Sequence, residues 1–335
     1  MKKTLSLIFI LLFLFSSCEL AYKQTPYDIN LITIALDYSN TDVNSLNGTI
    51  NDAREIEKAF RESCKRNQIN YTSNNFYQIG TSYDFQTINN NQYPKKANIL
   101  KALDELINSS NDSSINIIYY SGHSDSNGSW LLGTTDSENG DSFDRFDIIK
   151  YDQILSVNKI YKKLKLVKGK KLIIVDSCYS GNFKQDSPYS LDENNFTFDS
   201  AYKKLLSKEN TIDDNIFILC ATEKNNYAHE PTYCSGQRLH GYFTKALLEG
   251  MGWCDGEKGV LTYNCINSLT DNNGIQGTLA TGLPPAAKKH CLSIDSLDQY
   301  IKQNQDILLK SEDILIEHQY PQITGKRFDL VLFKY

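Results

Sequence analysis

The chain has 335 residues, of which 40% are hydrophobic and 22% are charged, so it is long and apolar enough to fold and disorder is excluded. Its formal net charge is −5 and its pI is about 5.6, with no dense run of Lys and Arg, which removes the electrostatic signature of a nucleic-acid-binding protein. The composition suits one large α/β domain or two small ones.

The first eighteen residues have the layout of a secretory signal peptide. Two lysines precede an apolar run over residues 5–15, and two serines stand directly before Cys18. The run is too short for a permanent membrane span, and small residues before a cysteine resemble the cleavage site of a bacterial lipoprotein. We therefore expect export from a bacterial cell and a lipid anchor on Cys18, on the periplasmic side or the cell surface. Plain secretion and a buried N-terminal helix are the alternatives.

After a linker over 19–29, short apolar runs typical of strands alternate with segments whose apolar residues recur at helical spacing. Strands are expected at 30–36, 75–79, 115–120, 171–175, 216–220 and 328–333. Helices are expected at 50–60, 99–107, 154–164, 242–248 and 297–308. This alternation predicts an α/β fold in which helices cover a sheet.

Two stretches interrupt the alternation. Residues 182–214 are polar, and residues 253–294 form an insertion rich in Gly, Asn and Cys. Both are long for simple connections, so they are expected to be functional loops, small subdomains or flexible segments. The predicted main domain therefore covers 30–252, and a C-terminal helix and strand over 295–335 complete it.

The cysteines do not by themselves define a pattern of disulfide bonds. Apart from Cys18 and Cys178, the chain contains Cys64, Cys220, Cys234, Cys254, Cys265 and Cys291. Six cysteines allow fifteen pairings, and the sequence does not choose among them. No pair has the CxxC spacing of a zinc site. Disulfide-bonded cysteines and buried thiols both stay open.

His123 and Cys178 each stand directly after a strand of the buried type, and the carboxyl ends of such strands are where α/β sheets bind ligands. A nucleophilic cysteine needs an imidazole nearby and backbone N–H groups to hold an oxyanion. Gly122 and Gly181 allow the tight turns that expose the two side chains. Either residue alone is more often a surface or core residue, but their 55-residue spacing matches the offset of caspases. The pair predicts a cysteine peptidase site.

Sequence motifs around these residues resemble those of caspase-like cysteine peptidases, and most closely those of bacterial metacaspases. The two main motifs are IIYYSGHS at 117–124 and KLIIVDSCYSG at 171–181. Further similar segments are LNGTINDA at 46–53, GYFT at 241–244 and HQYPQ at 318–322. The resemblance implies a caspase-like sandwich, with a mostly parallel central sheet of about six strands and helices on both faces.

The resemblance also implies roles for individual residues in peptide hydrolysis. Cys178 would form an acyl-enzyme with the substrate, His123 would act as general base and acid, and the N–H groups of Ser124 and Cys178 would bind the oxyanion. Asp52, Ser121 and Asp176 match the pocket for the residue before the scissile bond. Two carboxylates there favour Arg or Lys in protein substrates. In the alternative, Asp52 caps its own helix and Asp176 binds local amides.

Two departures from the family pattern have consequences. Ser124 replaces the glycine that usually follows the histidine, which leaves open a second function, an inactive surface lipoprotein that binds a partner. The segment 148–152 contains Lys150 and Tyr151 where metacaspases have acidic calcium ligands. We therefore expect no cofactor, and the segment does not favour calcium activation.

Overall fold

The computed structural model describes fourteen stretches of the chain, and for residues 157–158, 178–179, 270–271, 274–275, 305–310 and 322–324 it describes the backbone alone. These stretches are 27–38, 44–78, 92–125, 128–133, 154–179, 215–222, 228–230, 239–254, 270–271, 274–275, 277–280, 282–310, 322–324 and 330–335. The expected signal peptide with Cys18, the segment 148–152, the loop 182–214 and two of the cysteines, Cys234 and Cys265, lie outside them. The predicted domain boundaries stay predictions.

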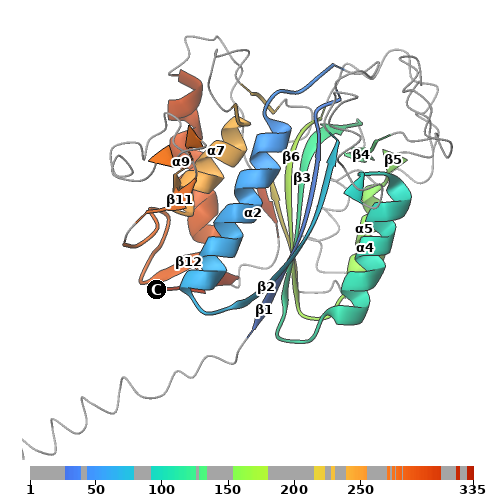
Figure 1. Ribbon diagram of the computed structural model, residues 1–335, viewed down its shortest axis with the longest axis horizontal. Helices are drawn as coiled ribbons and strands as arrows, with labels where there is room; N and C mark the ends of the chain where they lie inside the picture. Colours follow the sequence, from blue (N-terminus) through green and yellow to red (C-terminus); the bar gives the residue numbers. More distant parts are fainter. Residues whose placement is uncertain are drawn as a thin grey trace, which may run out of the picture.

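A twisted, mostly parallel sheet forms the centre of the molecule (Figure 1). Its main path runs in the order β13-β7-β6-β3-β1-β2, and every pairing along it is parallel except that of β13 with β7. These strands are β1 (Asp28–Leu36), β2 (Asn70–Gln78), β3 (Ile115–Ser124), β6 (Lys170–Tyr179), β7 (Ile216–Cys220) and β13 (Gln322–Thr324). Two short strands, β4 (Trp130–Leu131) and β5 (Ile154–Leu155), extend it beyond β3. The predicted α/β fold is confirmed.

Helices cover both faces of the sheet, as Figure 1 shows. One face is covered by α2 (Thr49–Arg66), α7 (Tyr242–Gly250) and α9 (Ile294–Lys310), and the other by α4 (Lys96–Ser109) and α5 (Val157–Leu164). Successive residues of a strand face opposite sides, so β3 supplies both cores. Ile117 and Tyr119 pack in the core under α2 and α7, whereas Ile118 and Tyr120 pack in the core under α4 and α5.

Small antiparallel ribbons lie outside the central sheet. β8 (Trp253–Cys254) pairs with β11 (Thr278–Leu279), β9 (Thr270–Asp271) with β10 (Gly274–Ile275), and β12 (Cys291–Ser293) with β14 (Val331–Lys334). The C-terminal strand expected at 328–333 is therefore β14 in a ribbon with β12. Among the described residues, the antiparallel edge of the central sheet is instead β13.

The helix expected at 154–164 begins three residues later than predicted. Ile154 and Leu155 form β5, and α5 begins at Val157 because the Ser156 side chain accepts a hydrogen bond from the backbone N–H of Lys159. A serine with extended backbone is a strong N-cap. The apolar residues before it were therefore wrongly assigned to the helix.

The described cysteines divide between the two open alternatives. Cys64, Cys220 and Cys291 are free thiols, and the first two are buried. Cys254, at the end of β8, is disulfide-bonded. Of the described helices, none is long and apolar enough to cross a membrane. Within the same residues, no group of three or more His, Cys, Asp and Glu side chains could hold a metal ion.

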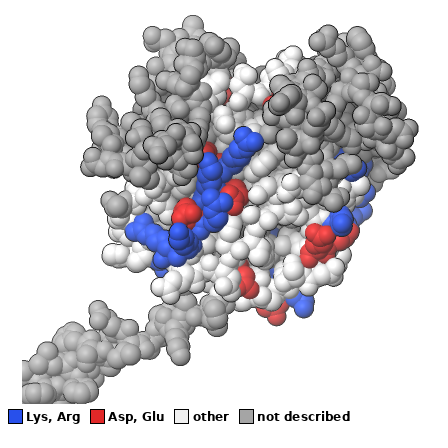
Figure 2. All heavy atoms as spheres, viewed as in Figure 1, with Lys and Arg blue, Asp and Glu red and all other residues white. Residues whose placement is uncertain are grey.

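Lys and Arg side chains form a stripe along α2 that the linear sequence did not reveal (Figure 2). The helical spacing of Arg54, Lys58, Arg61 and Lys65 places them on one face. Glutamates of the same helix pair with three of them at 2.7–3.8 Å. The stripe is therefore a mixed-charge surface, and the expectation that the protein binds no nucleic acid stays a prediction.

Candidate active site

The β3–β6 pair brings the predicted catalytic and pocket residues to one edge of the sheet. His123 is paired in register with Cys178, and two residues earlier Ser121 is paired with Asp176. The β3–β6 pairing continues to Ser124, whereas the pairing of β3 with β1 ends at Ser121. The end of β3 therefore carries the candidate histidine beyond its β1 neighbour and beside the backbone of Cys178.

The His123 imidazole is held through one of its two ring nitrogens. Nε2 lies 2.7 Å from the backbone oxygen of Asn44, which can only accept, so Nε2 carries the proton. Nδ1 is buried and has no hydrogen-bond partner among the described residues. Burial lowers the pKa of His123 below its ordinary value, although the bond to Asn44 acts in the opposite direction. The ring is therefore neutral near pH 7, with Nδ1 able to accept a proton.

Two buried tyrosines hold the backbone of His123. The Tyr38 hydroxyl accepts a hydrogen bond from the His123 N–H at 2.9 Å, and the Tyr120 hydroxyl donates to the His123 carbonyl. The Tyr38 ring also lies against the imidazole, with centroids 4.7 Å apart. A Cβ on Gly122 would lie 2.7 Å from the Tyr38 hydroxyl and 2.8 Å from that of Tyr120. Glycine is therefore required before His123 because the phenols approach its Cα closely, rather than for a turn.

Ser124, the replacement for the expected glycine, is fully buried at the end of β3. Its hydroxyl lies 3.2 Å from that of Ser177. Neighbouring residues of a strand direct their N–H groups to opposite sides, and the His123 N–H points away from β6 towards Tyr38. The Ser124 N–H therefore faces β6 and Cys178. The oxyanion role of these N–H groups stays a prediction.

Asp52 enters the site from the first turn of α2 and is almost completely buried. Its Oδ1 lies 2.8 Å from Nδ1 of His240 and its Oδ2 3.2 Å from the Ser121 hydroxyl. The Gly241 N–H donates to both oxygens at 3.2–3.3 Å. Burial raises the pKa of Asp52 and these bonds lower it, with burial the larger effect. Asp52 makes no cap for its own helix.

Asp176 lies on the same side and binds the start of α7. Its Oδ2 accepts from the Thr244 hydroxyl at 2.6 Å and from the Thr244 N–H at 3.3 Å. Burial and the nearby charge of Asp52 raise the pKa of Asp176 to about 8. A Cβ on Gly241 would lie 2.5 Å from Asp176 and 3.3 Å from Asp52, so both carboxyl groups lie close to one glycine. The carboxyl pair therefore retains a proton at neutral pH.

Known proteins were compared with the chain as a whole. A family model described as the caspase domain matches residues 31–329, which is most of the sequence. This chain belongs to the caspase domain family. Among solved structures, the crystal structure of a Geobacter sulfurreducens protein is similar, with 15% identity and a TM-score of 0.44, covering 89% of this chain and 92% of the other. That similarity is too weak to bear on function. No curated protein matches the chain.

Several residues of this caspase domain site were not predicted from the sequence. Asn44 acts through its backbone oxygen, which no sequence pattern reveals. Glu230 accepts from the N–H groups of Asn47 and Gly48 at 2.8 and 2.7 Å, which joins the segment just before α2 to a distant part of the chain. Burial raises the pKa of Glu230 as well. His240 could have been suspected, because it directly precedes the GYFT motif.

Proposed function

We propose that this caspase domain is a cysteine endopeptidase in which Cys178 is the nucleophile and His123 the general base and acid. The Cys178 thiol gives its proton to His123 Nδ1 and attacks the substrate carbonyl. His123 then returns the proton to the leaving amine, and water hydrolyses the acyl-enzyme with the same histidine as base. The peptide bond breaks between the acyl group held by Cys178 and the departing amine.

The observation that carries the proposal is the register of His123 with Cys178, together with the state of the imidazole. Paired residues of neighbouring strands project from the same face of a sheet, which supports contact between the two side chains. Because the Asn44 oxygen accepts the hydrogen bond from Nε2–H, Nδ1 is available to accept the proton of the thiol. Because the Asn44 carbonyl orients the imidazole, the proposal requires no carboxylate beside His123.

The N–H groups of Ser124 and Cys178 are proposed to bind the oxyanion. Both belong to residues paired in the β3–β6 ladder, where N–H groups face carbonyl groups of the neighbouring strand. The last rung has to open before these groups can turn to a substrate. Ser124 is compatible with that change because it needs only its N–H, which serine and glycine share.

Substrate selection is proposed to depend on Asp52, Ser121 and Asp176, with Arg or Lys before the scissile bond. Two buried carboxyl groups repel one another, and at neutral pH they share a proton. A guanidinium or ammonium group would replace that proton and form charge-assisted hydrogen bonds. The bonds to His240 and Thr244 hold the carboxyl groups in place, so the cation has to share or displace these donors.

An Arg-directed acyloxymethyl ketone probe tests the nucleophile directly. We expect it to modify Cys178 in the wild type and to leave Cys178→Ala and His123→Ala unmodified. The buried free thiols Cys64 and Cys220 serve as internal controls, since their pKa values are raised to about 12 and they should not react. Modification of Cys178→Ala to more than a tenth of the wild-type level would contradict the assignment.

The alternative is a binding lipoprotein without turnover, and the Ser124 replacement is the feature that favours it. Wild-type protein that binds basic peptides but is never labelled would support that function. Because no cofactor is proposed, labelling should be the same with calcium or with a chelator.

The lipid anchor is a separate proposal: Cys18→Ala should move the protein out of the membrane fraction, because two acyl chains anchor stably where one does not.

A further inference from the structure

The neighbour of β3 changes at the candidate histidine, because β1 ends before it and β4 pairs with β3 only at Ser124. The last pair between β1 and β3 joins Ala35 to Ser121, and β1 ends at Leu36. The backbone N–H and carbonyl of His123 point to that side. Buried backbone groups without partners are costly, so groups outside β1 have to bind them.

Two phenol groups bind the backbone of His123 where β1 no longer reaches it. Tyr38 accepts from the His123 N–H at 2.9 Å and donates its only proton to the Leu131 carbonyl at 2.7 Å. Tyr120 donates its only proton to the His123 carbonyl. The two hydroxyls lie 3.1 Å apart. Both backbone groups of His123 therefore bind side chains, one from β3 itself and one from the second residue past β1.

The surroundings make this arrangement rigid. Tyr38 is 3% exposed and Tyr120 is fully buried, and burial raises the pKa of each phenol, so both keep their protons across the working range. The Tyr120 ring stacks on Trp130 with 4.5 Å between centroids and 4° between planes. Tyr38 adopts a left-handed backbone conformation with φ 56°, which is unfavourable for a tyrosine, so the surrounding contacts have to hold it.

We propose that Tyr38 and Tyr120 are positioning residues for the reaction, which grip the His123 backbone so that its imidazole faces Cys178 and the Ser124 N–H faces β6. The inference rests on the proposed function, because it assigns the tyrosines to the same dyad. The peptide between His123 and Ser124 is planar, so the bond from Tyr120 to the His123 carbonyl also fixes the direction of the Ser124 N–H. One pair of hydroxyls thus positions the base and holds the Ser124 N–H in the β3–β6 ladder, from which it turns to a substrate only when the last rung opens.

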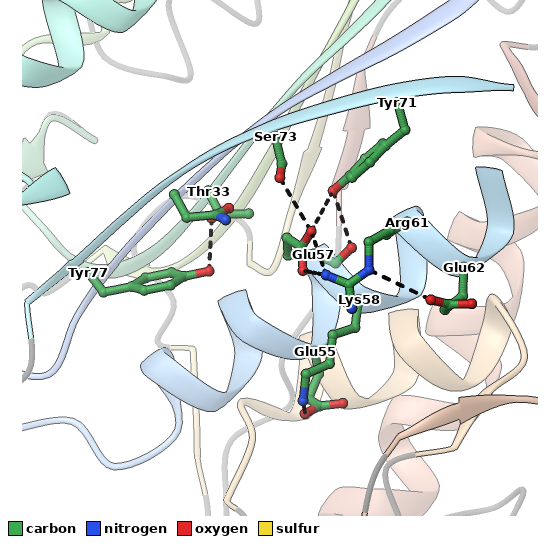
Figure 3. A network of polar contacts seen from close by, with 10 residues as sticks. Thr33, Glu55, Glu57, Lys58, Arg61, Glu62, Tyr71, Ser73 and Tyr77 are labelled. Carbon is green, nitrogen blue, oxygen red and sulfur yellow. Dashed lines mark hydrogen bonds and ion pairs between the residues drawn. The ribbon is translucent and has the colours of Figure 1, made fainter. Parts of the chain in front are cut away.

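Single hydroxyl deletions test the proposal, since Phe keeps the ring packing. The variants are Tyr38→Phe and Tyr120→Phe, and the matched control is Tyr77→Phe, which loses a hydroxyl 3.2 Å from Thr33 in the same sheet (Figure 3). The readout is the rate of Cys178 alkylation by iodoacetamide against pH, with thermal unfolding measured alongside. An imidazole-paired thiol reacts below the ordinary thiol range. We expect alkylation at pH 6.5 to fall at least about tenfold in both variants and less than about twofold in Tyr77→Phe.

A second readout does not depend on the thiol. In the Cys178→Ala background, NMR titration of His123 should show its pKa moving up towards the ordinary value in Tyr38→Phe and Tyr120→Phe, because a loosened ring is better hydrated. If both tyrosine variants match Tyr77→Phe in alkylation profile and in His123 titration, the proposal is overturned. If the wild type alkylates like an isolated thiol, the dyad fails, and the titration alone then decides the role of the tyrosines.

The double variant sharpens the result. Because the two hydroxyls lie 3.1 Å apart and serve one residue, Tyr38→Phe combined with Tyr120→Phe should cost little more than the larger single change. Additive losses would show two independent packing effects and would count against a single positioning unit. If Tyr38→Phe does not fold, Tyr120→Phe carries the same test against the same control.

Discussion

The two ends of the central sheet both contain hydrogen-bonded polar side chains, but they use them differently. At the amino end, Thr72, Asn30 and Asn116 form a row across β2, β1 and β3 in which hydroxyl and amide groups bond to each other at 2.7–2.8 Å. The carboxyl end contains two carboxyl groups, Asp176 of β6 and Asp52 of α2. The amino-end groups are neutral, whereas the carboxyl-end groups have raised pKa values.

This difference separates polar groups that hold the fold from those that can do chemistry. An amide row pairs each donor with an acceptor and has no charge to lose, so it stabilises the sheet and nothing else. Two carboxyl groups brought together in a buried place cost free energy that the fold has to offset elsewhere. Such groups are expected where a ligand of opposite charge binds.

The largest expected effect is on selectivity, from Asp52→Asn. Each charged hydrogen bond to a substrate cation contributes roughly 1.5–3 kcal/mol. The variant should therefore lower kcat/KM for Arg and Lys substrates by about ten- to a hundredfold, since each 1.4 kcal/mol is tenfold. Asn keeps an acceptor for the Gly241 N–H, so the start of α7 is disturbed little.

Substrates with Gln before the scissile bond provide the internal control. Their kcat/KM should fall much less in Asp52→Asn, measured with matched fluorogenic peptides. Equal losses for basic and neutral substrates would mean that Asp52 supports only the fold through His240 and Gly241.

The second effect is a dependence of stability on pH that comes from Asp176. Its pKa is raised to about 8 in the folded protein, so between about pH 4 and 8 the folded state holds a proton that the unfolded state has released. The contribution to stability is complete below that window and is lost as pH rises through it, with a slope of at most about 1.4 kcal/mol per unit. We expect the free energy of unfolding to fall by about 1–2 kcal/mol from pH 6 to pH 8.

Asp176→Asn is the control for that slope, because the amide keeps an oxygen for Thr244 and cannot titrate. Urea unfolding at pH 6, 7 and 8 should give a flatter profile for the variant than for the wild type. A slope that is the same in both proteins would assign the pH dependence to other groups, and Asp176 would then be ionised in the fold.

The third effect tests the amino end, with Thr72→Val. The change keeps the shape and removes the hydroxyl that donates to Asn30 at 2.7 Å. Since Thr72 is exposed and water can replace it, the expected loss of stability is about 0.5–1 kcal/mol. The ratio of kcat/KM between Arg and Gln substrates should stay the same, and a changed ratio would mean that the amino end also influences the pocket.

Much of this fold could be predicted because its strands are buried on both faces. The continuous apolar runs ending in SGH and DSC became β3 and β6. The helices of the fold followed from apolar residues at helical spacing. The expectation was less accurate where a side chain decides. Ser156 ends β5 and begins α5 through one capping bond, and β14 pairs with β12 instead of the central sheet. Neither depends on hydrophobic periodicity.

The site was harder to predict because its contacts join distant parts of the chain. Position at a strand end was enough to bring His123 beside Cys178. It could not reveal that Asn44 holds the imidazole through a backbone oxygen, since a carbonyl has no sequence signature. Nor could it show that His240 binds Asp52 across 188 positions. The expectation that Gly122 serves a turn was wrong, because two phenol groups lie where a side chain at this position would have to be.

The smallest expected effect comes from a charged network on the outside, between α2 and β2 (Figure 3). Glu57 accepts from Arg61 at 2.8 Å and also lies 3.3 Å from the hydroxyls of Tyr71 and Ser73. The Arg61 side chain is 48% exposed, so its pairing with Glu57 is screened by water and worth only about 0.3–0.5 kcal/mol. Arg61→Ala should lower the free energy of unfolding by about that amount, and 0.5 M salt should remove most of the difference. The selectivity ratio should not change. Urea unfolding at low and high salt measures this, and a loss above about 1 kcal/mol would mean that the two hydroxyls do not satisfy Glu57 without the arginine. Asp52 and Glu57 lie on the same helix and both are buried, so the contrast depends on the partner: Glu57 pairs with Arg61, whereas only Asp52 is proposed to face a substrate.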